Sequence, residues 1–169
     1  MKILSESEMI LAAEKLGNLM LKEITQNYVI YLEGDLGAGK TTFVKGFMDG
    51  MHFDEVVNSP TFSLIERIEL PNHYVFHVDL YRINNKAELF ELDLHEEAYL
   101  DKPSIHLIEW PQKGEGVILS PDLRIIFNTL VDPNQREIFF EDFSGKLGNR
   151  SPGCTIGVRV HIRCHPILL

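Results

Sequence analysis

Five residues with the chemistry to hold a polyphosphate lie close together in the first quarter of the chain. Gly34, Gly39, Lys40 and Thr41 satisfy every fixed position of the pattern G-x-x-x-x-G-K-[ST], and Gly37 adds a glycine inside it. Glycines allow such a loop to curl with positive φ and to turn its backbone N–H groups inward. Lys40 is then expected to contact the terminal phosphates, and the Thr41 hydroxyl to ligate Mg²⁺. The pattern predicts a nucleoside triphosphate site; a chance glycine-rich turn is the alternative.

The segments on either side of this loop are those that a phosphate site requires. An apolar run over residues 28–32 predicts a buried strand, and an amphipathic segment over residues 42–48 predicts a helix. A helix that starts near Gly39 adds unpaired N–H donors and a partial positive charge where the phosphates would lie. The residues expected to bind the nucleotide are Asp35, Leu36, Gly37, Ala38, Gly39, Lys40, Thr41, Thr42 and, from a later loop, Thr61.

Two carboxylates at the ends of predicted strands are candidates for the second half of the site. Asp79 ends one apolar run, and Glu109 follows another. Because strand ends beside a phosphate loop point at the ligand, Asp79 is predicted to position Mg²⁺, and Glu109 to orient or deprotonate a water. The alternatives are a turn-capping aspartate and a purely structural glutamate. The predicted catalytic residues are thus Lys40, Asp79 and Glu109, and the predicted metal ligands are Thr41, Asp79 and Glu109.

Four further residues have weaker functional interpretations. Thr61 follows Pro60 in a loop where a switch segment would sense the terminal phosphate, although an ordinary turn threonine fits equally well. Arg82 is suited to neutralise a transferred phosphoryl group or to pair with the nearby acidic stretch. His77 is expected to pack within the sheet, and Trp110, the only tryptophan, to close the core rather than to stack near the nucleotide.

The remaining pattern predicts one α/β domain. Helices are expected over residues 6–24 and 86–99, the first opened by a Ser5–Glu8 capping box, and strands over residues 62–69, 74–79, 104–108, 123–130 and 137–143. A turn at Pro71-Asn72 predicts an antiparallel pair, and another turn lies at residues 132–134. We therefore expect a mixed β-sheet flanked by helices, similar to that of P-loop NTPases, over residues 1–143. Residues 144–169 are interpreted as a poorly ordered tail or one unrelated to the core fold.

Composition and charge narrow the functional classes. The chain of 169 residues has a formal net charge of −9, and residues 1–143 hold 12 Lys or Arg against 25 Asp or Glu. Such an acidic body is not expected to bind nucleic acid by itself, so a partner would have to contact any RNA. No apolar run has the length of a membrane span or a signal peptide, which predicts a cytoplasmic protein. Cys154 and Cys164 are then expected to form no stable disulfide, and a metal site with His161 and His165 is disfavoured because the spacing is wrong.

Four blocks in this order resemble the TsaE family (formerly YjeE) of small bacterial ATPases. They are Gly34–Thr42, Ser59–Phe62, His77–Arg82 and Glu109-Trp110, and the resemblance covers residues 5–143. It implies an ATPase that supports synthesis of threonylcarbamoyladenosine in tRNA, working with the TsaD–TsaB complex and meeting tRNA only through that complex. It also implies ATP and Mg²⁺ as the ligands, held by Lys40, Thr41 and Asp79, with Thr61 in a switch-like segment and Glu109 handling the water.

Two other functions stay open at this point. A small-molecule kinase would need an acceptor pocket and usually an arginine-rich lid, but residues 83–101 contain many acids and no arginine. A nucleotide-gated binding module would need occupancy rather than hydrolysis. Adenine is preferred to guanine because Asn85–Glu88, the nearest match to the guanine-reading N-K-x-D pattern, ends in the wrong residue.

Overall fold

The computed structural model describes residues 1–91, 100–132 and 135–145, which form one mixed sheet with two α-helices. Within these residues the sheet has seven strands in the order β1-β7-β6-β2-β5-β4-β3. The strands are β1 (Lys2–Ile3), β2 (Tyr28–Gly34), β3 (Ile65–Glu69), β4 (Tyr74–Asp79), β5 (Ser104–Glu109), β6 (Leu123–Thr129) and β7 (Arg136–Asp142). The helices are α1 (Glu6–Glu23) and α2 (Lys40–Gly50), and short 3₁₀ segments follow β4 (Lys86–Glu91) and β5 (Pro111–Gly114).

The four central strands β6, β2, β5 and β4 run parallel, whereas β3, β7 and β1 pair in antiparallel fashion at the two sides. This arrangement confirms the predicted fold class. Its consequence for the site is that β2, β5 and β4 end at the same edge of the sheet. Leu32 of β2 and Asp79 of β4 are both in register with Glu109 of β5. The glycine-rich loop (Gly34–Thr41) and both candidate carboxylates therefore meet at one edge.

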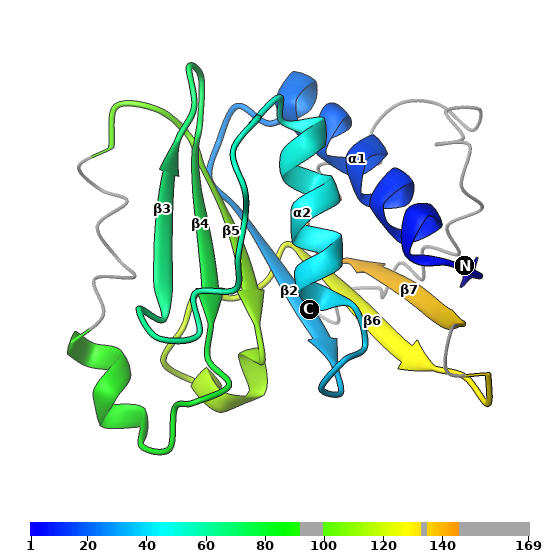
Figure 1. Ribbon diagram of the computed structural model, residues 1–169. Coiled ribbons are helices and arrows are strands. Elements are labelled where there is room, and N and C mark those ends of the chain that lie inside the picture. Colours follow the sequence, from blue (N-terminus) through cyan, green and yellow to red (C-terminus); the bar gives the residue numbers. More distant parts are fainter. Residues whose placement is uncertain (92–99, 133–134, 146–169) are drawn as a thin grey trace.

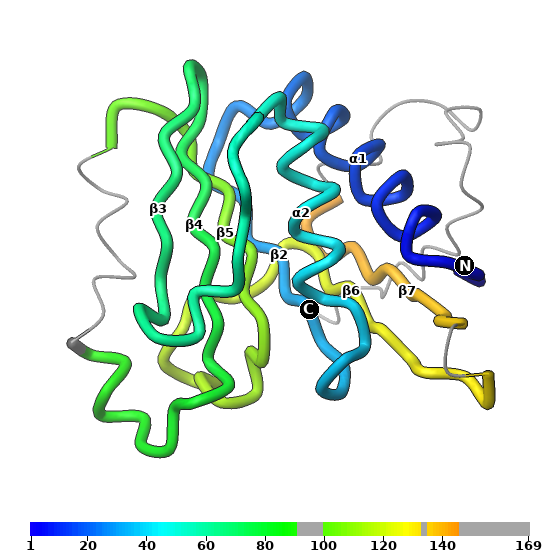
Figure 2. The backbone as a smooth tube through the Cα atoms, in the orientation of Figure 1, coloured from blue at the N-terminus to red at the C-terminus, as the bar shows by residue number. Residues whose placement is uncertain are grey.

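Alternating side chains of the central strands form two apolar layers. Ile30, Val75 and Leu107 belong to the layer that packs against α1 and α2. Val29 and Phe76 belong to the layer on the opposite face of the sheet. Both helices lie side by side across the same face of the sheet (Figure 1). The opposite face is covered in part by Leu80 and Ile83, which follow β4, and by Leu89 of the 3₁₀ segment. The backbone trace shows the N-terminus and the start of α1 at the side of the sheet where β7 lies (Figure 2). No helix among the described residues is long and apolar enough to cross a membrane.

Several predicted boundaries differ from the structure. Strand β3 begins at Ile65 rather than at residue 62, because residues 61–64 form a turn in which the Leu64 amide donates to the Pro60 carbonyl at 2.7 Å. Strand β1 was not predicted, because two residues are too few to show an alternation of apolar and polar side chains. The helix predicted over residues 86–99 is a 3₁₀ segment as far as Glu91, and residues 92–99 lie outside the described residues. The same holds for residues 133–134 of the predicted turn and for residues 146–169, which include Cys154, Cys164 and both tail histidines.

Glycine at position 46 permits the close contact between α1 and α2. A Cβ at Gly46 would lie 2.4 Å from the carbonyl oxygen of Ile10 and 2.7 Å from its Cα. We expect Gly46→Ala to lower the free energy of unfolding by about 1–3 kcal/mol, because the atoms it meets belong to the backbone of α1 and cannot turn aside. Denaturant unfolding measures the effect, with Lys45→Ala at the exposed neighbouring position as control. A Gly46→Ala variant more stable than the parent would contradict this packing.

Candidate functional site

The loop between β2 and α2 has the backbone conformation that its glycines were expected to give. Gly37 has φ of 75° and Gly39 has φ of 101°, values that residues with a Cβ rarely adopt. Gly39 is the N-cap of α2, which begins at Lys40. The free N–H groups at the start of this helix therefore face the concave side of the loop, as an anion site requires. Leu36, at the tip of the loop, is exposed.

The Lys40 side chain is folded back into the loop. Its Nζ donates to the carbonyl oxygens of Gly34 and Asp35 at 2.7 and 2.9 Å and lies 4.1 Å from the centre of the Trp110 ring. The side chain is buried, and burial lowers the pKa of Lys40, while the nearby carboxylates of Glu109 and Asp79 act in the opposite direction. The hydrogen-bond partners of this desolvated ammonium are neutral carbonyls, so binding of an anion beside it would be favourable.

Glu109 lies at the centre of a contact between the loop and the sheet. Its Oε1 accepts a hydrogen bond from Thr41 Oγ1 at 3.1 Å and lies 3.0 Å from Nε2 of His77. Glu109 is 3% exposed and His77 is fully buried. Among the described residues, Nδ1 of His77 has no hydrogen-bond partner, so the Nε2 contact is the one that orients its ring. His77 packs in the sheet, as predicted. Its contact with Glu109 was not predicted.

Asp79 is held by the loop that contains Thr61. Asp79 Oδ2 accepts from Ser59 Oγ at 2.5 Å, and Ser59 in turn accepts from Thr61 Oγ1 at 3.0 Å. The second oxygen, Oδ1, accepts from the backbone N–H of Tyr81 at 3.0 Å. Thr61 is thus connected to Asp79 through Ser59. The sequence showed that Ser59 and Thr61 flank Pro60, but it did not predict this connection.

The oxygen atoms at this edge of the sheet suit a magnesium ion whose remaining ligands are phosphate and water. Thr41 contacts Glu109, and Glu109 is in register with Asp79 on the neighbouring strand, so the three predicted ligands lie together. Nowhere in the described ranges do three or more His, Cys, Asp or Glu side chains form a group that could hold a metal. Mg²⁺ commonly uses one or two carboxylates with substrate phosphates, so these residues fit Mg²⁺ bound with a nucleotide rather than alone.

Two other candidate residues have contacts that the sequence did not settle. Arg82 places its guanidinium 4.2 Å from the Phe62 ring, next to the turn that contains Thr61. Trp110 is partly buried; it packs on the second apolar layer and has its ring 5.1 Å from that of Tyr81, in addition to the contact with Lys40. Trp110 therefore serves the core, as predicted, and also borders the loop.

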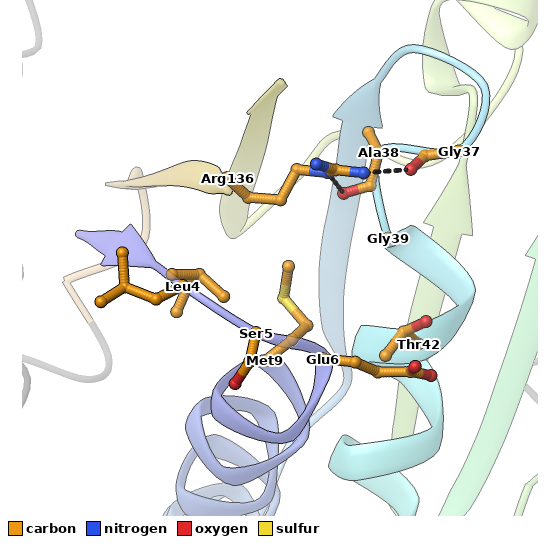
Figure 3. A pocket seen from close by; sticks show the side chains of 10 residues that line it. Leu4, Ser5, Glu6, Met9, Gly37, Ala38, Gly39, Thr42 and Arg136 are labelled. Carbon is orange, nitrogen blue, oxygen red and sulfur yellow. Dashed lines mark hydrogen bonds between the residues drawn. The ribbon is translucent and has the colours of Figure 1, made fainter. Parts of the chain in front are cut away.

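Arg136 is a site-supporting residue that sequence reasoning missed. From the first position of β7 it donates to the carbonyls of Ala38 and Gly37, through Nε at 3.1 Å and Nη2 at 3.0 Å (Figure 3). Nearly a hundred residues separate donor and acceptors. No local pattern marks such an arginine, because the contact exists only once β7 has joined the sheet.

Trp110 provides a spectroscopic test of the loop. If nucleotide draws the Lys40 ammonium toward phosphate, its contact with the indole ring changes, so we expect saturating Mg²⁺ and ATP to alter the emission of this single tryptophan. Fluorescence titration measures the change, and Lys40→Met should remove it. An unchanged spectrum under conditions where calorimetry detects binding would contradict the expected movement of Lys40.

Comparisons with known proteins agree on one kind of relative. A family model described as "Threonylcarbamoyl adenosine biosynthesis protein TsaE" matches residues 4–138. The chain is 33% identical to the tRNA threonylcarbamoyladenosine biosynthesis protein TsaE of Haemophilus influenzae, over 83% of this chain and 89% of that protein. It is 38% identical to the protein of the same name from Bacillus subtilis, over 72% of each. The crystal structure of Bacillus subtilis YdiB superposes with a TM-score of 0.60 at 29% identity, covering 82% of this chain and 80% of that one.

Proposed function

Because the chain belongs to the TsaE family of threonylcarbamoyladenosine biosynthesis proteins, we propose that it serves this tRNA modification as an ATPase. In this proposal it binds and hydrolyses ATP with Mg²⁺ while in complex with the TsaD–TsaB transferase. The observation that carries the proposal is the meeting of Lys40, Thr41 and two carboxylates at the mouth of one glycine-rich loop. A site that only bound phosphate would need the glycine-rich loop but not the two carboxylates beside it.

Each residue of this group has a distinct part in hydrolysis. Lys40, whose ammonium is already desolvated, neutralises charge on the terminal phosphates, and the N-terminal N–H groups of α2 contact their oxygens. Thr41 and Asp79 would hold Mg²⁺, which would supply further neutralisation of the developing charge. Glu109 accepts a proton from, or orients, the attacking water, and His77 keeps its carboxylate in place.

The loop that contains Thr61 connects the nucleotide site to the protein surface. Thr61 reaches Asp79 through Ser59, so a change in what Asp79 binds is transmitted to residues on the protein surface. Phe62, the next residue, is 87% exposed. A switch of this kind would allow partners to read nucleotide occupancy.

The acidic character of residues 1–143 supports a role for partner proteins. With roughly twice as many acidic as basic side chains, this part of the chain is poorly suited to hold tRNA phosphates. In the proposal TsaD–TsaB contacts the tRNA, and this chain drives the complex by hydrolysis. A tRNA-modifying role also supports a cytoplasmic location.

Hydrolysis measured with and without partners tests the proposal. We expect weak ATP turnover by the protein alone, stimulation by TsaD–TsaB in the presence of Mg²⁺ and tRNA, and loss of both in Asp79→Ala. Turnover that TsaD–TsaB leaves unchanged would argue against the partner. Phosphate transfer to an added small molecule would favour a kinase instead.

A further inference from the structure

Arg136 reaches the glycine-rich loop from the other end of the folded chain, and none of the steps proposed above uses it. It is the first residue of β7, where its backbone is in register with Ile3 of β1 on one side and with Thr129 of β6 on the other. A side chain that starts from a strand paired on both sides has a well-defined origin. The groups that its guanidinium contacts are therefore tied to the sheet.

The guanidinium group of Arg136 contacts two successive carbonyl groups of the loop. Nε donates to the Ala38 carbonyl at 3.1 Å, and Nη2 donates to the Gly37 carbonyl at 3.0 Å (Figure 3). The remaining nitrogen, Nη1, donates to the Gln135 carbonyl at 2.9 Å. Because the guanidinium group is planar and carries its donors in a rigid fork, these contacts fix the two loop carbonyls relative to each other.

Fixing a carbonyl also fixes the N–H of the same peptide group. A trans peptide is planar, so its C=O and its N–H point in opposite directions, and both peptides concerned are trans. The peptide between Gly37 and Ala38 is held at both ends, because the Ala38 N–H donates to the Asp35 carbonyl at 3.1 Å. The peptide between Ala38 and Gly39 has its carbonyl on Arg136, so the Gly39 N–H points away from Arg136.

The loop needs such an external contact because its own residues restrict it weakly. Gly37 and Gly39 flank Ala38 with φ of 75° and 101°, and a Cβ at Gly37 would have no atom beyond its chain neighbours within 4 Å. Glycines in open space allow the adjoining peptide groups to rotate at little steric cost. A rotated peptide would turn a carbonyl oxygen toward a bound phosphate in place of an N–H, and the two negative groups would repel each other.

Arg136 differs from Lys40 in how a bound nucleotide would affect its contacts. Lys40 holds the carbonyls of Gly34 and Asp35 at the start of the loop, and in the proposed function its ammonium neutralises the phosphates. Arg136 holds the two carbonyls nearer to α2 and has no part in that step. Its contacts are thus compatible with both the empty and the occupied loop.

We propose that Arg136 is a positioning residue: its guanidinium group holds the Gly37 and Ala38 carbonyls away from the bound phosphates and so keeps the loop N–H groups directed at them. The inference rests on the proposed function, because it assumes that the loop binds the phosphates of a nucleotide. It goes further in making phosphate affinity depend on the antiparallel edge of the sheet and not on the loop sequence alone.

Inorganic tripolyphosphate with Mg²⁺ tests the proposal, since it presents phosphates without a nucleoside. In calorimetry we expect Arg136→Ala to bind it at least about tenfold more weakly than the parent, because a loop that must be ordered on binding loses affinity. Arg136→Lys should lose nearly as much, because an ammonium keeps the charge but cannot hold two carbonyls in one fixed geometry. Thermal unfolding verifies the fold; if Arg136→Ala does not fold, Arg136→Lys, which keeps an aliphatic stem, carries the comparison.

Free guanidinium ion separates positioning of the loop from a general effect on the fold. Arg136 lines a cavity of about 430 Å³ beside the loop, so a small cation can enter from solvent once the side chain is removed. Millimolar guanidinium chloride should restore part of the tripolyphosphate affinity of Arg136→Ala. Sodium chloride at the same concentration should not, because it only screens the phosphate charges.

Arg124→Ala is the matched control. Arg124 belongs to the same β6–β7 pair and is partly buried like Arg136, but its ion pairs with Glu33 and Glu141 join strands and not loop carbonyls. We expect Arg124→Ala to bind tripolyphosphate as the parent does, whatever its effect on thermal unfolding.

Each way of failing has its own meaning. If the Arg136 variants bind tripolyphosphate as the parent does, the loop keeps its shape unaided and only this inference is overturned. A loss that guanidinium does not restore in Arg136→Ala, or one that Arg124→Ala shares, would also overturn it, because the cause would then be the fold of the sheet edge. If the parent binds neither tripolyphosphate nor the β,γ-imido analogue of ATP, the proposed function fails and this inference fails with it.

Discussion

Replacing Lys40 with methionine is expected to weaken binding of ATP at least about 100-fold, or about 2.7 kcal/mol. The Lys40 ammonium is the positive charge that the glycine-rich loop itself supplies, and it donates to the carbonyls of Gly34 and Asp35. A charge-assisted contact to phosphate in such a buried place is worth more than an ordinary hydrogen bond. Calorimetric titration with the imido analogue measures the loss.

Methionine is chosen because it separates loss of binding from loss of the fold. Burial lowers the pKa of Lys40, so its protonated form costs stability at every pH below that lowered pKa. That cost disappears only as the pH rises through the lowered pKa towards the ordinary value. Lys40→Met removes it while keeping the apolar stem, so we expect the variant to unfold within about 1 kcal/mol of the parent. Lys45→Ala, which changes an exposed lysine five residues further along α2, is the binding control. Unchanged ATP affinity in Lys40→Met would remove the basis of the proposed function.

Replacing Glu109 with glutamine is expected to lower ATP turnover by about 10²–10⁴-fold while leaving ATP affinity within about threefold. The amide is nearly the same size, and its oxygen still accepts from Thr41, so the loop should keep its shape. What is lost is the negative charge that can take a proton from water or support the metal. Single-turnover hydrolysis and calorimetry on the same preparation measure the two effects separately.

Two further variants show whether Glu109 acts through chemistry or through shape. Glu115→Gln makes the same change at an exposed position and should leave turnover unaffected. His77→Gln keeps a donor toward Glu109 and should cost less turnover than His77→Ala, which leaves the buried carboxylate without that contact. If Glu109→Gln abolished hydrolysis but left partner-dependent tRNA modification intact, nucleotide occupancy alone would carry the function, and the protein would be a gated binding module.

The sequence by itself determined the elements that carry the site. The glycine spacing predicted the loop and a helix that starts near Gly39, and α2 begins at Lys40. The apolar run before Asp79 predicted a strand ending on that residue, as β4 does, because a strand buried on both faces is a continuous apolar segment. Local periodicity and turn residues act over a few positions, and a single sequence displays them directly. The mixed sheet followed from these elements.

The tertiary structure alone decided how distant residues meet. The contacts of Glu109 with Thr41 and His77, and of Arg136 with the loop, join segments 32 to 99 residues apart, and no pattern in either segment marks the other. A cavity between the N-terminal segment and the loop is lined by Ile3 and Arg136, which the pairing of β1 with β7 brings together at the edge of the sheet. Strand order sets which side chains share an edge, and strand order is a property of long-range pairing. The sequence therefore indicated a phosphate site, and the fold decided which residues surround it.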